Sequence, residues 1–143
     1  MARHHEGRDR HVEERRRLVD GARVDDRSRY LSLATYRASG AEVATPVWFV
    51  SVDGRLFVFT AGDAGKVKRL RRSSRARVAP CDARGNLLAA WRDATARLVT
   101  DAATIRHAEA AFDAKYGWQK RLLDLGSRLS GRIRRRAWIA VDV

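Results

Sequence analysis

The stretch from Glu42 to Thr60 reads EVATPVWFVSVDGRLFVFT, and it decides the fold that the rest of the chain must accommodate. Residues 42–52 predict one long strand, Asp53-Gly54 is a strong signal for a tight turn, and residues 55–60 predict the returning strand. Pro46 has no N–H to donate to a ladder, so it indicates a sheet edge, a bulge or a place where something other than a strand lies alongside. The stretch therefore predicts an antiparallel hairpin.

Strands and helices are predicted on both sides of this hairpin. Alternating residues in YLSLATY predict a strand over 30–36. Further strands are predicted over 77–82, over 87–100 as one strand or two joined by a bend, and over 137–143. Helices are predicted over 66–72, over 102–116 with Thr100 or Asp101 as the cap, and over 119–132. This order predicts a mainly β, α+β fold: a closed or partly open antiparallel barrel with helices on its outside.

Composition narrows the class of protein. The 143 residues are 45% hydrophobic, which suits a single domain with a sizeable core. The lone Cys81 excludes an internal disulfide, and no Cys/His spacing suits a structural zinc site. Apolar runs of only a few residues exclude a membrane-spanning helix, and the charged N-terminus lacks the apolar core of a secretory signal. We therefore expect a cytoplasmic protein without a bound metal.

The first 27 residues differ in composition from the rest. They are rich in Arg, Glu, Asp and His and poor in apolar residues. Such a segment cannot bury enough surface to offset its ordering entropy, so residues 1–27 are predicted to form a mobile tail with at most a short helix over 12–22. Its histidines, His4, His5 and His11, are expected to be solvated. The folded domain is predicted over 28–143.

Positive charge is concentrated in two segments. The chain carries 30 Lys and Arg against 17 Asp and Glu, a net charge of +13. Residues 66–77 (KVKRLRRSSRAR) hold seven basic residues and no acid, and residues 128–136 (RLSGRIRRR) hold five more. A local field of this strength indicates an anionic partner: a phosphate-bearing small molecule, a nucleic acid or a membrane surface. A GC-rich coding sequence, which favours Arg and Ala, is the alternative explanation of the excess.

The segment TAGDAGKVKRLRR, residues 60–72, has the features of a phosphate site. A strand ends, a loop with two glycines follows, and a helix begins near Gly65 with Lys66 and Arg69 three residues apart on one face. Free N–H groups and the positive end of the helix dipole favour an anion there, and the two side chains add charge-assisted hydrogen bonds. The segment is not a Walker A loop, because Thr60 stands where that motif has Gly, and Val67 where it has Ser or Thr. A solvated basic helix face is the alternative.

No catalytic side chain is evident in the sequence. Trp48 is either core packing or an exposed aromatic that flanks a planar ring. His107 is the single histidine outside the tail and is expected on a helix surface. Ser73 and Ser74 have no histidine near them in the sequence, and Cys81 is expected to be buried and inert. We nominate no catalytic residue.

Three motifs carry a resemblance to a known family: ATPVWF at 44–49, the helix start GKVKRL at 65–70 and RVAPCDARG at 77–85. Together they resemble the pyridoxamine-phosphate-oxidase-like split β-barrel superfamily. Within it they are most similar to the branch of probable coenzyme F420-dependent oxidoreductases, found mostly in actinobacteria. The resemblance continues more weakly through ARL at 96–98 and KYG at 115–117, so it covers about residues 30–143.

The resemblance implies a homodimer of six-stranded split barrels with cofactor sites in the grooves between the subunits. The ring of a flavin or deazaflavin would lie along the strand of Thr45, Pro46, Val47 and Trp48, with Ala79 and Pro80 bordering the site. Its phosphate would be held at the helix start by Thr60, Gly65, Lys66 and Arg69, with Val67 beside them. Such enzymes generally need no side-chain acid or base, because the cofactor carries the hydride chemistry on a small organic substrate.

Coenzyme F420 is the expected cofactor, and FMN is the alternative. FMN presents one phosphate, for which two or three cations suffice. Coenzyme F420 carries a phosphodiester followed by an oligoglutamate tail. Several more cations are available to follow such a tail: Lys68, Arg71, Arg72, Arg75 and Arg77.

Other functions stay open from the sequence. A noncatalytic flavin or lipid carrier fits the same fold. A nucleic-acid-binding module fits the basic runs, although the basic helix lacks the interleaved aromatics that single-strand binding uses. Within the last predicted helix, Leu122, Leu125 and Leu129 form a stripe that is expected to pack in the core or a dimer interface, or to touch an acidic membrane surface.

Overall fold

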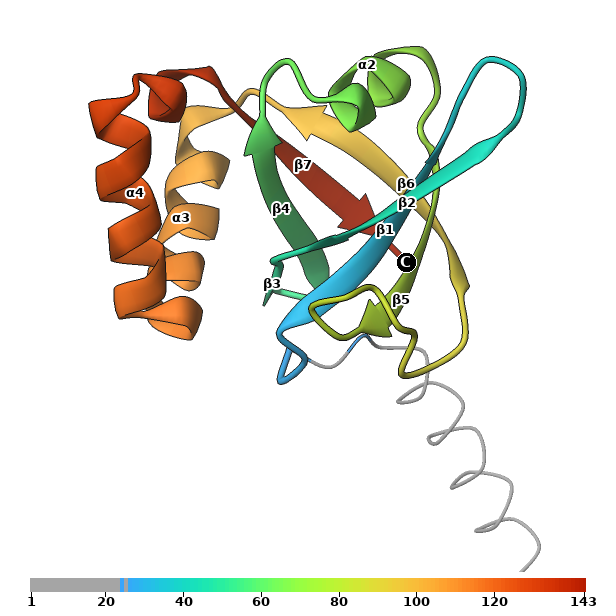
Figure 1. Ribbon diagram of the computed structural model, residues 1–143, viewed down its shortest axis with the longest axis horizontal. Helices are drawn as coiled ribbons and strands as arrows, with labels where there is room; N and C mark the ends of the chain where they lie inside the picture. The colour runs from blue at the N-terminus through green and yellow to red at the C-terminus, as the bar shows by residue number, and fades with distance from the viewer. Residues whose placement is uncertain (1–23, 25) are drawn as a thin grey trace, which may run out of the picture.

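The computed structural model describes residues 24 and 26–143 of the chain (Figure 1). Its strands are β1 (Tyr30–Tyr36), β2 (Glu42–Val47), β3 (Val50–Val52), β4 (Arg55–Ala61), β5 (Arg75–Cys81), β6 (Arg92–Val99) and β7 (Arg136–Asp142). Its helices are α2 (Gly65–Arg72), α3 (Ala102–Tyr116) and α4 (Trp118–Leu129), and a 3-10 turn, η1 (Arg132–Arg135), follows α4. The predicted mobile tail lies outside the described residues over 1–23 and at 25.

The strands form one curled antiparallel sheet with the order β2-β1-β5-β6-β7-β4-β3. It makes a half-barrel with α2 at one end, while α3 and α4 lie side by side along its flank (Figure 1). The two edge strands, β2 and β3, are consecutive in the sequence, so the chain crosses from one edge of the sheet to the other between Val47 and Val50. The predicted split β-barrel with flanking helices is confirmed.

The described part of the chain has seven strands rather than the six expected, because the predicted strand over 42–52 is divided at Trp48 and Phe49. Phe49 has a fully buried side chain, and its backbone bonds to α3 instead of to a neighbouring strand. Its N–H donates to Tyr116 Oη at 3.0 Å, and its carbonyl accepts from Lys115 Nζ at 2.8 Å. Pro46 keeps its place in β2, and its indication of a sheet edge is confirmed.

Alternation along the strands produces two hydrophobic layers. In β7, Ile139 and Val141 belong to the cluster that also holds Leu31, Leu33 and Phe49. The intervening Trp138 and Ala140 belong to a second cluster that includes Ala108, Phe112 and Tyr116 of α3. Side chains with a period of two therefore fill the barrel on one face of β7 and hold α3 on the other.

Local signals explain most element boundaries. Asp101 caps α3, since its Oδ2 accepts from the Thr104 N–H at 2.9 Å, and α4 begins after Gly117, whose φ is +58°. The strand predicted over 87–100 covers only 92–99. Before it, Asp82 holds a turn by accepting from the N–H groups of Arg84 and Asn86, each at 2.9 Å.

The described residues ahead of the predicted domain start at 28 already contact the barrel. Val24 packs in the cluster with Leu31, and the Asp26 carboxylate accepts from the Ser51 N–H at 3.0 Å. The boundary after residue 27 stays a prediction. None of the helices in the described part of the chain has the length and apolar character that a membrane crossing requires.

Candidate functional site

The first turn of α2 is an uncapped helix N-terminus. The N-cap residue is Ala64, which has no polar side chain, and no side chain accepts from the first turn. The Val67 N–H donates to the Ala64 carbonyl at 3.1 Å, as expected for the start of a helix. Because the first N–H groups of a helix have no intrahelical acceptor, those of Gly65 and Lys66 are available to an anion.

Arg69 folds back over this helix start. Its Nε donates to Thr35 Oγ1 on β1 at 2.6 Å. A Cβ added to Gly65 would lie only 2.7 Å from Arg69 Nη1, so the guanidinium passes directly beside the Gly65 backbone. Glycine at this position therefore allows the guanidinium and the free N–H groups to converge.

Lys66 is the second cation of the site. Its side chain is partly buried, and within residues 26–143 no acid pairs with it. Burial lowers the pKa of the Lys66 ammonium, and the nearby charge of Arg69 lowers it further. The Arg69 pKa is also lowered, by burial and by the charges of Arg37 and Arg72. The start of α2 is thus a region of uncompensated positive charge.

The residues predicted to border the cofactor ring lie in two adjacent rows across β2, β1 and β5. Pro46 and Ala79 both pair with Ser32, and Val47 and Pro80 both pair with Leu31. The Val47 side chain packs in the barrel core, and Ala79 is buried, whereas Pro46 is exposed. The four positions are neighbours in the sheet, but Pro46 and Ala79 face one side of it, and Val47 and Pro80 face the other.

Thr45 carries an unsatisfied polar atom. Its Oγ1 is buried and has no hydrogen-bond partner among the described residues. Thr45 pairs with Leu33, a core residue, so the hydroxyl belongs to the inward-facing row of β2. A buried hydroxyl left without a partner costs free energy, so this position favours an additional polar group.

Three predicted site residues have other surroundings. Trp48 stacks on Tyr116, with ring centroids 4.4 Å apart and an interplanar angle of 8°, so one face of its ring is already covered. Val67 buries its side chain in the core, and its N–H is used within the helix. Thr60 pairs with Ala137 of β7 near the end of β4.

Gly65, Lys66 and Arg69 form the compact part of the predicted site, and two residues that were not predicted from the sequence support them. Thr35 receives the Arg69 hydrogen bond, and Arg37 adds to the positive charge. The sequence does mark Thr35 as unusual, because it is a polar residue in the inward-facing series of Leu31 and Leu33.

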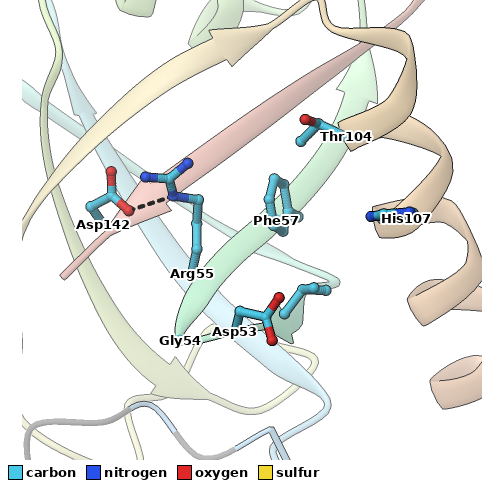
Figure 2. A pocket seen from close by; sticks show the side chains of 8 residues that line it. Asp53, Gly54, Arg55, Phe57, Thr104, His107 and Asp142 are labelled. Carbon is cyan, nitrogen blue, oxygen red and sulfur yellow. Dashed lines mark hydrogen bonds and ion pairs between the residues drawn. The ribbon is translucent and has the colours of Figure 1, made fainter.

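A pocket of about 330 Å³ lies elsewhere, at the β3–β4 turn and the first turns of α3 (Figure 2). Figure 2 shows Arg55 and Asp142 on one side of Phe57 and His107 on the other; Arg55 Nε pairs with Asp142 Oδ1 at 2.7 Å. The Thr104 hydroxyl donates to Asp101, the N-cap residue of α3, rather than to His107. None of the predicted cofactor residues lines this pocket.

Two other sequence expectations concern reactive residues. Cys81 is buried, and burial followed by the charge of Asp82 raises the pKa of its thiol, which disfavours the reactive thiolate. Across residues 24 and 26–143, no group of three or more His, Cys, Asp or Glu side chains is placed to hold a metal ion.

Comparison with solved structures identifies proteins of the same fold. A conserved hypothetical protein of Mycobacterium tuberculosis has a TM-score of 0.59 and 19% identity, covering 80% of this chain and 72% of its own. The heme storage protein HutZ of Vibrio cholerae has a TM-score of 0.60 and 15% identity, covering 81% and 82%. An FAD-binding protein of Mesorhizobium loti has a TM-score of 0.57 and 12% identity, covering 88% and 87%.

Sequence comparison identifies the family. No curated protein matches the chain. The family model described as pyridoxamine 5'-phosphate oxidase matches residues 22–143, which include every strand described above and the uncapped start of α2. On this match, the chain belongs to the pyridoxamine 5'-phosphate oxidase family.

Proposed function

We propose that the chain is an oxidoreductase that binds a deazaflavin, coenzyme F420, with the cofactor's phosphate at the start of α2. FMN is the alternative cofactor. The observation that carries the proposal is Lys66, a partly buried cation beside Arg69 with no acid paired to it among the described residues. Burying a charge without a partner is costly, and a bound phosphate removes that cost.

The geometry of the helix start suits a phosphoryl group. The free N–H groups of the first turn and the Arg69 guanidinium converge where Gly65 has no side chain. Thr35 fixes the orientation of that guanidinium through its hydrogen bond to Nε, which leaves the η nitrogens to face a ligand. These donors are held before the ligand arrives, so less ordering is required on binding.

The choice of F420 over FMN rests on the cations beyond Lys66 and Arg69. Arg77 is already held by Glu42 through two hydrogen bonds of 3.0 Å, and Arg72 Nη2 donates to the Tyr36 carbonyl at 3.2 Å. Lys68 and Arg71 are exposed and without an ion pair in the described part of the chain. These two cations extend the positive surface of α2 beyond the phosphate, which suits a ligand with several negative charges.

The remaining site residues would position the ring. β2 is an edge strand bonded to β1, so the backbone groups on its other side are open to a ligand. The unpartnered Thr45 Oγ1 offers one further polar contact. When bound, the deazaflavin or flavin would supply hydride transfer to or from a small organic substrate.

Two proteins of the same fold support a planar cofactor: one is named as an FAD-binding protein and one as a heme storage protein. We further propose that two copies assemble so that the groove between them completes the ring site. Exposed Ala44 and Pro46 on the open β2 edge support this assembly, since they leave the backbone accessible to a second copy.

A fluorescence titration of purified protein with F420 and with FMN tests the proposal. F420 is expected to bind more tightly, and Lys66→Gln is expected to weaken binding about tenfold to a hundredfold, as loss of one charge-assisted bond implies. Lys68→Gln titrated with FMN, which lacks the oligoglutamate tail, is the matched control: it removes the same charge from the same helix at an exposed position, and should weaken FMN binding far less than Lys66→Gln does.

Equal effects of the two lysine variants on FMN binding would refute a specific phosphate site at the helix start. Tighter binding of FMN would replace F420 with the alternative cofactor. Weak binding of both cofactors, together with tight and salt-sensitive binding of DNA, would support the nucleic-acid-binding function instead.

A further inference from the structure

Helix α4 packs against the barrel side of the molecule with its charged face. Lys120 is completely buried, and its Nζ lies 3.0 Å from Asp113 Oδ1 and 2.6 Å from Asp124 Oδ2. Asp124 also accepts from Arg136 Nη1 at 2.8 Å, and Arg136 Nη2 donates to the Ser127 hydroxyl at 3.1 Å. Hydrogen bonds and ion pairs therefore line this face of α4.

The opposite face of α4 is apolar and points away from the protein. Trp118, Leu122, Leu125 and Leu129 are 68%, 59%, 56% and 82% exposed, and these four residues are called the α4 stripe. Their spacing of four, three and four residues places them in one line along the helix. In Figure 1, α3 lies between α4 and the barrel, so α4 is the outermost layer on this flank. An amphipathic helix with its apolar face outward is expected to have a partner.

Positive charge borders the stripe. Arg121 and Arg128 are exposed, occupy one flank of the stripe and make no ion pair in the described part of the chain. The nearest acids, Asp113 and Asp124, are already paired with Lys120. The partner of the stripe must therefore tolerate arginines beside an apolar line, and it is stabilised if it carries negative charge.

We infer that the α4 stripe inserts into the interfacial region of a bilayer that contains anionic lipids. A helix with leucines and a tryptophan on one face and arginines at the border lies in the plane of such an interface, with its apolar side chains among the acyl chains. The arginines then contact lipid phosphates. This contact is peripheral, and it is separate from the cofactor site at α2.

A second copy of the chain is a poorer occupant for two reasons. Stable protein interfaces use about 20–30 residues on each side, whereas the stripe offers four large side chains on a helix about 18 Å long. Pairing two stripes would also bring the Arg121 and Arg128 flanks of two chains with a charge of +13 each close together. An anionic bilayer has neither disadvantage.

Co-sedimentation with vesicles at physiological salt tests the inference. The full chain is expected to sediment with vesicles of phosphatidylcholine and phosphatidylglycerol, and not with phosphatidylcholine alone. Leu125→Gln with Leu129→Gln keeps the net charge and is expected to weaken partitioning about tenfold for each leucine. Arg121→Gln with Arg128→Gln should weaken it about fivefold for each arginine. Leu88→Gln is the control, because Leu88 is 66% exposed in a loop outside α4.

Quenching by brominated lipids gives an independent readout. Intrinsic tryptophan fluorescence should be quenched by vesicles with brominated acyl chains in the wild-type protein, and much less in Trp118→Leu. The inference is overturned if the double leucine variant sediments like the wild-type protein, because net charge alone then explains binding. It is also overturned if that variant converts a dimer to a monomer in sedimentation equilibrium, because the stripe is then a contact between copies. Lys66→Gln should leave vesicle binding unchanged, so this test fails or succeeds independently of the cofactor site.

Discussion

The Tyr116 hydroxyl fastens the crossover between the two sheet edges, and Tyr116→Phe should cost about 2 kcal/mol of unfolding free energy. Its Oη lies 3.0 Å from the Phe49 nitrogen, 3.0 Å from the Phe49 oxygen and 2.8 Å from the Arg29 oxygen. Without the hydroxyl, the Phe49 carbonyl keeps its bond from Lys115, but the Phe49 N–H is left without a partner in a fully buried residue. A buried donor without an acceptor lowers the unfolding free energy by about 1–3 kcal/mol. The phenyl ring remains, so the stack with Trp48 is retained.

Urea unfolding followed by circular dichroism measures this loss as a lower midpoint at an unchanged slope. Tyr30→Phe is the matched control, because no hydrogen bond to the Tyr30 hydroxyl occurs among the described residues. A loss below about 0.5 kcal/mol, or one equal to that of the control, would show that the hydroxyl does not hold the crossover.

The same variant has a predicted pH signature. Burial raises the pKa of Tyr116 to about 12, partly offset by the hydrogen bond from the Phe49 backbone. Because the folded pKa lies above the unfolded value of about 10, the stability that this group contributes is complete below pH 10 and is lost as pH rises towards 12. A shift of this size corresponds to on the order of 2 kcal/mol. Tyr116→Phe should show a shallower fall in stability over this range, and an identical fall would refute the assignment.

Two further predictions concern the ion pairs. Asp124→Asn removes one carboxylate from both buried Lys120 and nearly buried Arg136, and should lower the unfolding free energy by about 3 kcal/mol in urea denaturation; a neutral result would mean that Asp113 and Glu109 neutralise Lys120 without it. The hydrogen bond from Arg77, opposed by burial and aided by Tyr36, lowers the pKa of Glu42. The stability from this pair is present above the unfolded pKa and is lost as pH falls through the folded one. Glu42→Gln should therefore flatten the decline in melting temperature below about pH 4.5. A decline in this pH range equal to that of the wild-type protein would contradict the prediction.

Much of the fold follows from patterns that act over a few residues. Alternation predicts β1, and the Asp53-Gly54 turn joins β3 to β4 as expected. The break at Trp48 and Phe49 has no local signal, because the groups that replace the ladder there come from Lys115 and Tyr116, 66 and 67 residues further along the chain. Residue periodicity within a strand therefore cannot predict that a distant side chain divides the strand.

The candidate site shows the same division. Helical spacing predicts that Lys66 and Arg69 lie on one face of α2. The Arg69 side chain passes close to the helix start, which explains why a glycine stands at position 65. Thr35 joins them only because β1 passes beneath α2, which is a tertiary contact. Helical spacing also explains why Val67 is not available. Val67 and Leu70 form the buried face of α2, whereas Lys66 lies at the border of that face and is only partly buried.

The two basic segments differ in burial, and burial decides which kind of anion each one suits. Lys66 and Arg69 lose water on folding and lie at a helix start, so a small phosphoryl group can satisfy both without displacing the chain. In the second segment, Arg136 is used internally by Asp124, whereas Arg128 stays exposed beside Leu125 and Leu129. A cation that remains solvated next to an apolar line gains little from a small anion, which brings no apolar surface. An extended surface that offers both negative charge and hydrocarbon suits such a cation. The similar charge densities of residues 66–77 and 128–136 therefore indicate two different partners.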